Sequence, residues 1–582
     1  MISKTILRII ISAISVTYLL ASGQDTTAYQ PLNSSEFLLS ESNLIIAPLD
    51  DWGLNASLNP YGLPEYGGSI KYLGFNMDDP LYGSVPVAWL NPRQQSITLD
   101  PSGTQISLSP VFADSGINYS RFDYYRGDYG FLNFSAEIAG NISENIYWRL
   151  YGEKLGYDGA YGLLGPKLNN FKESIIQNFF LDIKKLVKPW TINAGSSYQK
   201  YFPGMMHISE LGTSDGETFL SWSNAGRLKE YRTNFYLTGE KLKPNSSLAI
   251  GIQASNYLYN TIHDSSIYEY NAEAFQYSGL IRWTFNAGSG KITLKAQPLT
   301  ESVFVRHGMS KNRLQYQQSF EYASGESRFR YRVSLGSVNT QPVGGFHALY
   351  TANRHLTLNL ESTFDFIRYP LSYYTNIGGN NSTYPDDDGF TAFQQSLGLH
   401  YRFGNSYFKS AVHYTRADYL MPFKNTIEAT GFSFLAEELS RLYFTEEFKL
   451  MLPRHFSLKG KSIISPSPDQ NSSLVFQGWS RFTKDLFLFE NNLHLYLSGD
   501  LYYLKGSNTI GWFEQMRTQV ATNSEYYTNE RLQLGFIIGA RISSFHIFYS
   551  IYNAEGRAFS PLPGVLYRNR LKIFGVDWAF RN

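Results

Sequence analysis

The chain has 582 residues, with 50 lysines and arginines against 49 aspartates and glutamates, so its formal net charge is +1. A balance this even creates no long-range field for nucleic acid, and we expect no nucleic-acid partner. Cysteine is absent, which excludes disulfides and thiolate metal sites and leaves no residue for an N-terminal lipid anchor. Aromatic residues make up 16% of the chain although the mean hydropathy is -0.27. This combination favours a transmembrane β-barrel with aromatic girdles over a large soluble β-protein.

Residues 1–23 have the order of a secretory signal peptide. Lys4 and Arg8 precede an apolar run over residues 9–20, and three small residues follow it. The run is shorter than the roughly 20 residues that a membrane-spanning helix needs, so it indicates a cleaved export signal. We therefore predict a mature chain that begins near Gln24 and lies in the outer membrane of a Gram-negative bacterium.

Residues 24–117 differ in kind from the rest of the chain. They contain clusters of glycine, proline and asparagine, as in the segment from Leu58 to Pro64, and short apolar pieces without sustained alternation. Such a segment is unsuited to the wall of a barrel. We predict that it forms a small plug-like or periplasmic unit, and that residues 118–582 form the barrel.

The barrel prediction depends on long alternating strands. Between Leu356 and Phe366, apolar side chains on one face oppose polar ones, among them Glu361 and Asp365. The pattern lasts for about 10 residues, which crosses a bilayer, whereas sandwich strands cluster near 5 to 6. Similar runs follow at Phe329–Leu335 and Leu493–Tyr503. The fold class is therefore all-β, a transmembrane antiparallel β-barrel of about 20–22 strands with a small N-terminal plug-like segment.

Alternation also identifies candidate lumen-lining residues. Arg328, Arg330 and Arg332 lie on one face of a strand, opposite Phe329 and its apolar neighbours. Such a row of guanidinium groups could hold an anionic solute or set ion preference. The alternative is a structural ladder paired with carboxylates on neighbouring strands or on the plug-like segment. The same reasoning adds to the lumen set the residues Glu361, Asp365, His494 and Asp500.

The chain shows none of the sequence patterns of an enzyme. Gly-x-Ser-x-Gly, His-Glu-x-x-His and glycine-rich phosphate loops are absent, and the ten histidines lack ligand spacing. The acidic run at residues 386–388 lacks the spaced ligands of a calcium loop and indicates a solvated loop tip. We predict no catalytic residue, no metal site and no cofactor.

The C-terminal strand carries the first resemblance to a known family. Residues 571–580 read LKIFGVDWAF, in which Gly575, Trp578 and Phe580 fit the Gly-x-x-aromatic-x-aromatic closing signal of outer-membrane barrels. The segment from Pro561 to Phe580 resembles the final hairpin of TonB-dependent receptors and of the related porin-type barrels. The resemblance implies outer-membrane lipid and the barrel-assembly machinery as partners. Two residues follow the terminal aromatic, which departs from the pattern.

A second resemblance lies upstream. The segment from Ile70 to Leu99 is similar to part of the plug domain of TonB-dependent receptors, with a loop that contains Gly74, Asp78, Asp79 and Pro80. Residues 124–130 (YYRGDYG) resemble the first barrel hairpin of plug-bearing barrels of this type. The segment departs from the family in two ways. The family's plug is a longer domain, and a motif that binds the energy-coupling protein precedes it, whereas we find no such motif before this segment.

These departures make an outer-membrane channel our leading functional hypothesis. The channel would pass or selectively import a small solute, with the N-terminal segment partly occluding the lumen. One alternative is an active transporter like the TonB-dependent receptors, with an energy-coupling periplasmic protein as partner. Another is a barrel that serves as a surface-binding or assembly scaffold.

Overall fold

The computed structural model describes residues 34–581, and the predicted signal peptide lies outside this range. Within it, the description leaves out residues 43, 49–55, 60–62, 84–86, 88–89, 91–94, 100–104, 114–115, 158–173, 203–207, 215–216, 223–225, 264–270, 307–308, 325–327, 376–384, 386–387, 425–432, 466–475, 506–509, 514–517, 523–529 and 557–569. No helix among the described residues is both long and apolar enough to cross a membrane.

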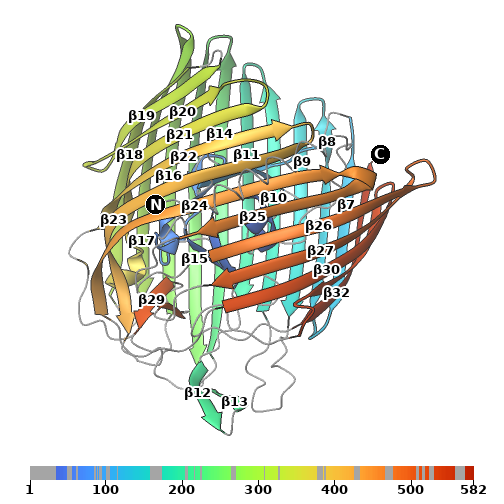
Figure 1. Ribbon diagram of the computed structural model, residues 1–582. Coiled ribbons are helices and arrows are strands. Elements are labelled where there is room, and N and C mark those ends of the chain that lie inside the picture. Colours follow the sequence, from blue (N-terminus) through green and yellow to red (C-terminus); the bar gives the residue numbers. More distant parts are fainter. Residues whose placement is uncertain are drawn as a thin grey trace.

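The described wall is a closed antiparallel barrel of 22 strands (Figure 1), which confirms the predicted fold class. The barrel closes where the last strand, β32 (Leu571–Arg581), pairs with the first, β7 (Tyr119–Gly127). The strands between them are β8 (Leu132–Ser143), β9 (Ile146–Tyr157), β10 (Ser174–Val187), β11 (Trp190–Phe202), β14 (Gly226–Lys243), β15 (Ser246–His263), β16 (Asn271–Ala287), β17 (Gly290–Val305), β18 (Lys311–Ser324), β19 (Phe329–Val338), β20 (Gln341–Thr351), β21 (Leu356–Arg368), β22 (Gly389–Phe403), β23 (Ser406–Lys424), β24 (Ser433–Leu452), β25 (Phe456–Ile464), β26 (Phe476–Leu488), β27 (Leu493–Lys505), β30 (Glu530–Ile542) and β31 (Phe545–Tyr552).

The sequence forms these strands because apolar and polar residues alternate with the period of the pleat. Large apolar side chains cover the outer surface, and the most exposed include Ile252 at 64% and Leu314 at 69%. Polar side chains at the intervening positions face the lumen, where Gln253 and Gln315 follow those two residues. An apolar outer surface of this kind is stable in contact with lipid, and the antiparallel ladders provide hydrogen-bond partners for the backbone N–H and C=O groups.

The two ends of the barrel differ in their connections. At one end strands join through tight turns, such as residues 188–189 between β10 and β11 and residues 404–405 between β22 and β23. At the opposite end most connections are longer, and two of them carry extra hairpins, β12–β13 (Ile208–Ser214 and Glu217–Trp222) and β28–β29 (Ile510–Phe513 and Thr518–Thr522). The first of these hairpins projects beyond the barrel in Figure 1.

The N-terminal residues 34–110, which we call the plug, form short elements of their own. They are helix α2 (Ser34–Glu41), the hairpin of β1 (Ile45–Pro48) and β2 (Ala56–Asn59), the 3-10 turn η1 (Glu65–Gly67), and a mixed sheet ordered β4-β3-β6-β5, with β3 (Ser69–Tyr72), β4 (Phe75–Asn76), β5 (Gln95–Leu99) and β6 (Gln105–Pro110). Strands β3 and β6 run parallel, which requires the long connection between them. Figure 1 shows the plug elements, in blue, surrounded by the wall.

Plug and wall share one apolar core. Phe75 and Leu81 of the plug are fully buried in the same cluster as Tyr257, Ala274 and Val303 of the wall. A continuous core of this kind excludes water between the two parts on that side of the lumen.

Candidate functional site at the interface of plug and wall

The shape of the plug loop depends on a tight turn between β3 and β4. Leu73 and Gly74 both have positive φ angles, 52° and 92°, as a two-residue hairpin turn requires. A Cβ atom at Gly74 would lie 3.1 Å from Leu280 of the wall, so a larger residue would be both strained and crowded. The turn presents the following loop, residues 76–83, to the barrel wall.

Asp79 is the centre of this loop. Its Oδ1 atom accepts hydrogen bonds from the backbone N–H groups of Leu81 (2.8 Å) and Tyr82 (3.2 Å) and from the hydroxyl of Tyr259 on β15 (2.6 Å). The carboxylate is 1% exposed. Because a buried charge is tolerated only when it is well hydrogen-bonded, Asp79 fixes the turn and the wall contact together.

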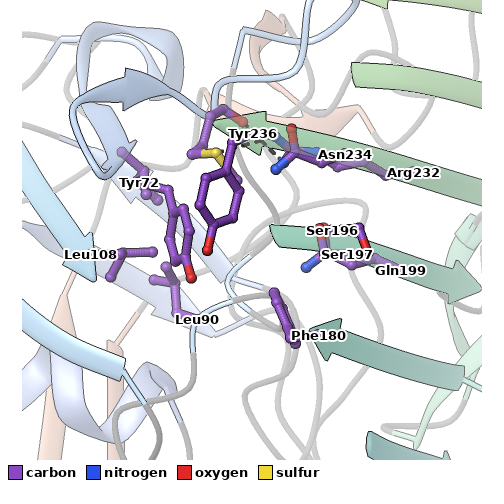
Figure 2. Close-up of a pocket in the computed structure, with 12 residues that line it drawn as sticks. Tyr72, Leu90, Leu108, Phe180, Ser196, Ser197, Gln199, Arg232, Asn234 and Tyr236 are labelled. Atoms are coloured by element: carbon purple, nitrogen blue, oxygen red, sulfur yellow. Dashed lines mark hydrogen bonds between the residues drawn. The ribbon is translucent and has the colours of Figure 1, made fainter. Parts of the chain in front are cut away.

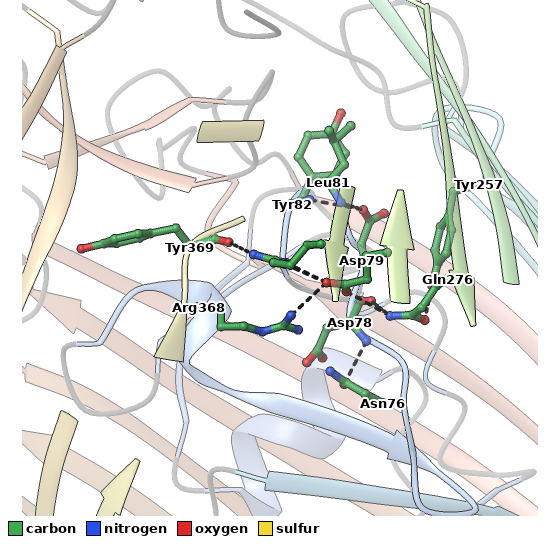
Figure 3. A network of polar contacts seen from close by, with 11 residues as sticks. Asn76, Asp78, Asp79, Leu81, Tyr82, Tyr257, Gln276, Arg368 and Tyr369 are labelled. Carbon is green, nitrogen blue, oxygen red and sulfur yellow. Dashed lines mark hydrogen bonds and ion pairs between the residues drawn. The ribbon is translucent and has the colours of Figure 1, made fainter. Parts of the chain in front are cut away.

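The wall also donates to carbonyl groups of the loop. The Arg232 guanidinium on β14 donates to the carbonyl of Met77 (3.2 Å), and the Gln276 side chain on β16 donates to that of Asp78 (3.3 Å). Figure 3 shows the second of these contacts, with Gln276 beside Asp78 and with Arg368 of the wall nearby. Wall side chains thus replace the backbone partners that a loop lacks.

The plug sheet is anchored by a cluster of aromatic and charged residues. The hydroxyls of Tyr72 on β3 and Tyr236 on β14 both donate to Oδ1 of Asp182 on β10, at 3.0 and 2.5 Å. Figure 2 shows the two tyrosine rings side by side, with centroids 5.4 Å apart. The other oxygen of Asp182 pairs with Arg149 (3.3 Å), which also pairs with Glu137 (2.6 Å). The wall therefore neutralises the buried carboxylate that holds the plug.

A segment of the wall folds inward to meet the plug. Residues 369–375, which we call the inner loop, follow β21 and include the 3-10 turn η6 (Leu371–Tyr374). The N–H groups of Leu371 and Ser372 donate to the carbonyls of Pro80 (3.1 Å) and Leu81 (2.9 Å). The ring of Tyr373 lies edge-on to that of Tyr66 in the plug, with centroids 5.8 Å apart.

The predicted lumen-lining residues divide between contacts with the plug and contacts within the wall. Asp500 accepts from Arg481 at 2.5 and 2.6 Å, and Arg481 also pairs with Glu36 in helix α2. The His494 ring contacts Asp485 of the neighbouring strand, with Nε2 2.8 Å from Oδ1.

Arg330 and Arg332 lie on the face of β19 opposite Phe329, and Arg328 directly precedes this strand. Arg332 pairs with Glu321 of β18 at 3.4 Å, as the alternative of a structural ladder expects, and both Arg328 and Arg330 are exposed. Glu361 on β21 is buried, and Asp365 on the same strand lines a cavity beside the plug. The ligand or ion preference of these residues stays a prediction.

The closing strand places its signal residues on two faces. Trp578 and Phe580 are exposed on the outer surface, whereas Gly575 faces the lumen, where a Cβ would collide with Phe548 and Tyr125. Glycine is therefore required where the last strand passes aromatic rings of both neighbours.

Several residues that bind the plug were not singled out by the sequence. Asp182, Arg232, Tyr236, Tyr259 and Gln276 occupy ordinary alternating positions of wall strands. The alternation predicts that they face the lumen, but their partners lie more than 50 residues away along the chain. Among the described residues no group of three or more histidine, aspartate or glutamate side chains is arranged to hold a metal ion.

Comparison with known proteins rests on structure. No family model matches the chain, and no curated protein matches its sequence. The FrpB iron transporter from Neisseria meningitidis superimposes with a TM-score of 0.72 at 10% identity, covering 95% of this chain and 98% of that one. The siderophore receptor PirA from Acinetobacter baumannii superimposes with a TM-score of 0.69 at 9% identity, covering 94% of this chain and 96% of that one. A mutant of the ferric enterobactin receptor PfeA from Pseudomonas aeruginosa superimposes with a TM-score of 0.68 at 10% identity, covering 94% of this chain and 96% of that one.

Identities this low establish the fold alone. The chain has the plugged 22-strand β-barrel fold of TonB-dependent receptors.

Proposed function

We propose that this chain imports a solute across the outer membrane through a lumen that the plug closes, and that energy from a periplasmic coupling protein displaces the plug. This is the active-transport alternative of the sequence analysis. The observation that carries it is the attachment of the plug on several sides of the wall. Asp79 is bound by Tyr259 of β15, Tyr72 binds Asp182 of β10, and Glu36 binds Arg481 of β26.

A passive channel, our leading sequence hypothesis, is not confirmed. The plug and the wall share a buried apolar core, so a solute cannot pass on that side unless contacts break. Each buried hydrogen bond to a charged group contributes about 1.5–3 kcal/mol, so release of the whole interface needs an external source of energy. A surface-binding or assembly scaffold would not need a lumen closed by this many hydrogen bonds.

The structural neighbours give the first solutes to test. Their printed names are those of siderophore receptors and of an iron transporter. Uptake of ferric siderophores by cells that produce this chain is therefore the first assay, and uptake of neutral sugars is measured in parallel. We expect uptake of the true solute to stop when a protonophore dissipates the proton gradient, and undiminished uptake would contradict energy coupling.

A disulfide lock tests the requirement for plug displacement. Ser372 of the inner loop donates its N–H to the carbonyl of Leu81, so the two residues lie at a separation that a disulfide can span. The chain contains no cysteine, so the pair Leu81→Cys and Ser372→Cys would be the only thiols. We expect oxidation to abolish uptake and dithiothreitol to restore it.

A second cysteine pair serves as the control. Thr483 and Ser498 are opposite one another on β26 and β27 and their hydroxyls are 2.9 Å apart, so Thr483→Cys with Ser498→Cys joins wall to wall. This bond should leave uptake unchanged. Equal uptake by the oxidised and reduced plug-to-wall variant would contradict the proposal.

Conductance separates the gated barrel from an open pore. In planar bilayers we expect the full chain to be nearly silent and a variant without residues 24–99 to conduct. Stable open events from the full chain would favour the passive channel.

A further inference from the structure

A polar cavity of about 210 Å³ remains between the plug and strands β17–β22. Its wall side carries amide side chains from three strands, and its plug side carries polar groups of β3 and β4. A single water needs about 10–15 Å³ by the same measure, so the cavity has room for on the order of ten waters. Its lining includes Asp78 and Asp79 of the plug loop, so it borders the contacts that hold the plug in place.

Two buried amide atoms that line the cavity lack a hydrogen-bond partner among the described residues. They are the acceptor Oε1 of Gln315 on β18 and the donor Nε2 of Gln394 on β22. A buried polar atom without a partner costs about 1–3 kcal/mol, so both atoms call for a ligand or ordered water. One needs a donor and the other needs an acceptor.

The charged groups of the lining have partners within the protein. The cations are Lys71, Arg313 and Arg368, and the carboxylates are those of Asp78, Asp79, Glu301 and Asp365. Glu301 binds both guanidinium groups, at 2.8 Å to Arg313 and 3.0 Å to Arg368, and Arg313 also donates to the carbonyl of Tyr369. The Lys71 ammonium donates to Gln105 of the plug at 3.1 Å. These cations already have acceptors inside the protein, so the lining offers no unpaired cation to an anionic solute.

We propose that this cavity binds a small neutral polyhydroxylated solute of the sugar class. A hydroxyl group both donates and accepts, so one kind of functional group satisfies Gln315 and Gln394 together. A carboxylate cannot donate to the first and an ammonium cannot accept from the second. Further amide side chains line the cavity at Gln105, Gln297 and Gln317.

The place of the cavity connects binding with transport, and this step rests on the proposed function. The lining includes Lys71 and Asp78 of the plug as well as Tyr369 and Pro370 of the inner loop. A bound sugar would thus contact the plug and the wall segment that hydrogen-bonds to it. The sugar hydroxyls would displace water from the cavity. This displacement would strengthen binding only where the hydroxyls reproduce the hydrogen bonds that the water made.

Calorimetry on the purified full chain tests the proposal. The neutral probes are glucose, galactose and maltose, and the charged probes of similar shape are glucuronate and glucosamine. We expect at least one neutral sugar to bind at least tenfold more tightly than both charged probes. Absence of binding by all three neutral sugars, or equal binding by a charged probe, would overturn the inference.

Variants locate the binding in this cavity. We expect Gln315→Met combined with Gln394→Met to weaken sugar binding at least tenfold. The matched control is Gln318→Met on β18, whose side chain is exposed on the opposite face of the strand, and it should bind as the wild type does. Unchanged binding by the double variant would place the sugar elsewhere and overturn the inference.

A charge substitution keeps the test independent of folding defects. Gln315→Glu retains an acceptor at the same place and should shift preference toward glucosamine, a gain that a damaged barrel would not show. An unshifted preference contradicts the assigned contact. The disulfide lock and the conductance measurements need no sugar binding at this cavity, so a failure here and a failure of the import mechanism give different results.

Discussion

Buried carboxylates hold the plug in the lumen, and each is satisfied by several donors. Asp79 receives two backbone N–H groups and one tyrosine hydroxyl, and Asp182 receives two tyrosine hydroxyls and an arginine. Such bonds to a charged acceptor are stronger than neutral ones, and removal of the acceptor leaves buried donors without partners. Single substitutions at these positions should therefore loosen the plug without opening the wall.

Asp79→Ala should increase the susceptibility of the plug to protease, because three donors lose their acceptor. The loss per bond to a charged group is about 1.5–3 kcal/mol. Tyr259→Phe removes only one of the three bonds and should have a smaller effect. The rate of proteolysis of folded protein in detergent measures both, and identical rates for wild type and Asp79→Ala would contradict the role of this carboxylate.

Asp78 gives the seating of the plug a dependence on pH. Burial raises the pKa of Asp78 from its ordinary value of 3.8 to about 7, although Lys71 and Arg368 oppose the rise. The seated plug therefore holds this proton more tightly than a released plug, in which the pKa returns toward 3.8. Its contribution to seating is complete below pH 3.8 and is lost as the pH rises through about 7.

We therefore expect more frequent conductance events at pH 8 than at pH 5 for the wild type. Asp78→Asn cannot ionise and should show a flatter profile over this range. An identical pH dependence in the two proteins would assign the effect to another group.

At the scale of elements, the inner loop joins the wall to the plug through aromatic packing. Tyr373 is fully buried and its ring contacts those of Tyr66, Tyr369 and Phe434 at centroid distances of 5.8, 5.6 and 4.8 Å. Apolar packing of this density orders a segment that would otherwise be a surface loop.

Tyr373→Ala should detach the inner loop, because loss of a buried aromatic side chain costs about 3–5 kcal/mol. We expect faster hydrogen exchange at Leu371 and Ser372, whose N–H groups bond to the plug. Tyr373→Phe retains the ring and should remain close to the wild type. Equal protection of these two amides in Tyr373→Ala would show that the packing is not what holds the loop.

At the scale of the molecule, barrel closure depends on β32 pairing with β7 over residues 573–581 and 119–127. Closure removes the two free edges that an open sheet would expose to lipid. The lumen face of β32 passes close to aromatic rings on both sides, and Gly575 provides the space.

Gly575→Val should prevent closure, because its side chain would occupy the space of Phe548 and Tyr125. Loss of the heat-modifiable band in electrophoresis measures the failure to close. Gly156→Val on β9 is the matched control, since a Cβ there meets nothing within 4 Å. A normal folded band from Gly575→Val would refute the steric requirement.

The sequence by itself determined the type of wall. Alternation with a period of two is a local property, and a bilayer requires the apolar face outward and every backbone group paired, so strands such as Leu356–Arg368 and the closing strand were predictable. The same alternation predicted that Asp500 and Arg332 face inward, although not which residue each would meet.

Only the tertiary structure decided that the lumen is plugged and where the plug is held. The partners Tyr72 and Asp182 are 110 residues apart, and Tyr259 and Asp79 are 180 apart. Such pairs leave no periodic signal, because every lumen-facing polar residue has the same kind of alternating neighbours along the chain. The closed barrel brings these distant strands around one short segment, and this geometry favours a gated importer, as the function we propose, over the partly occluded channel of the sequence hypothesis.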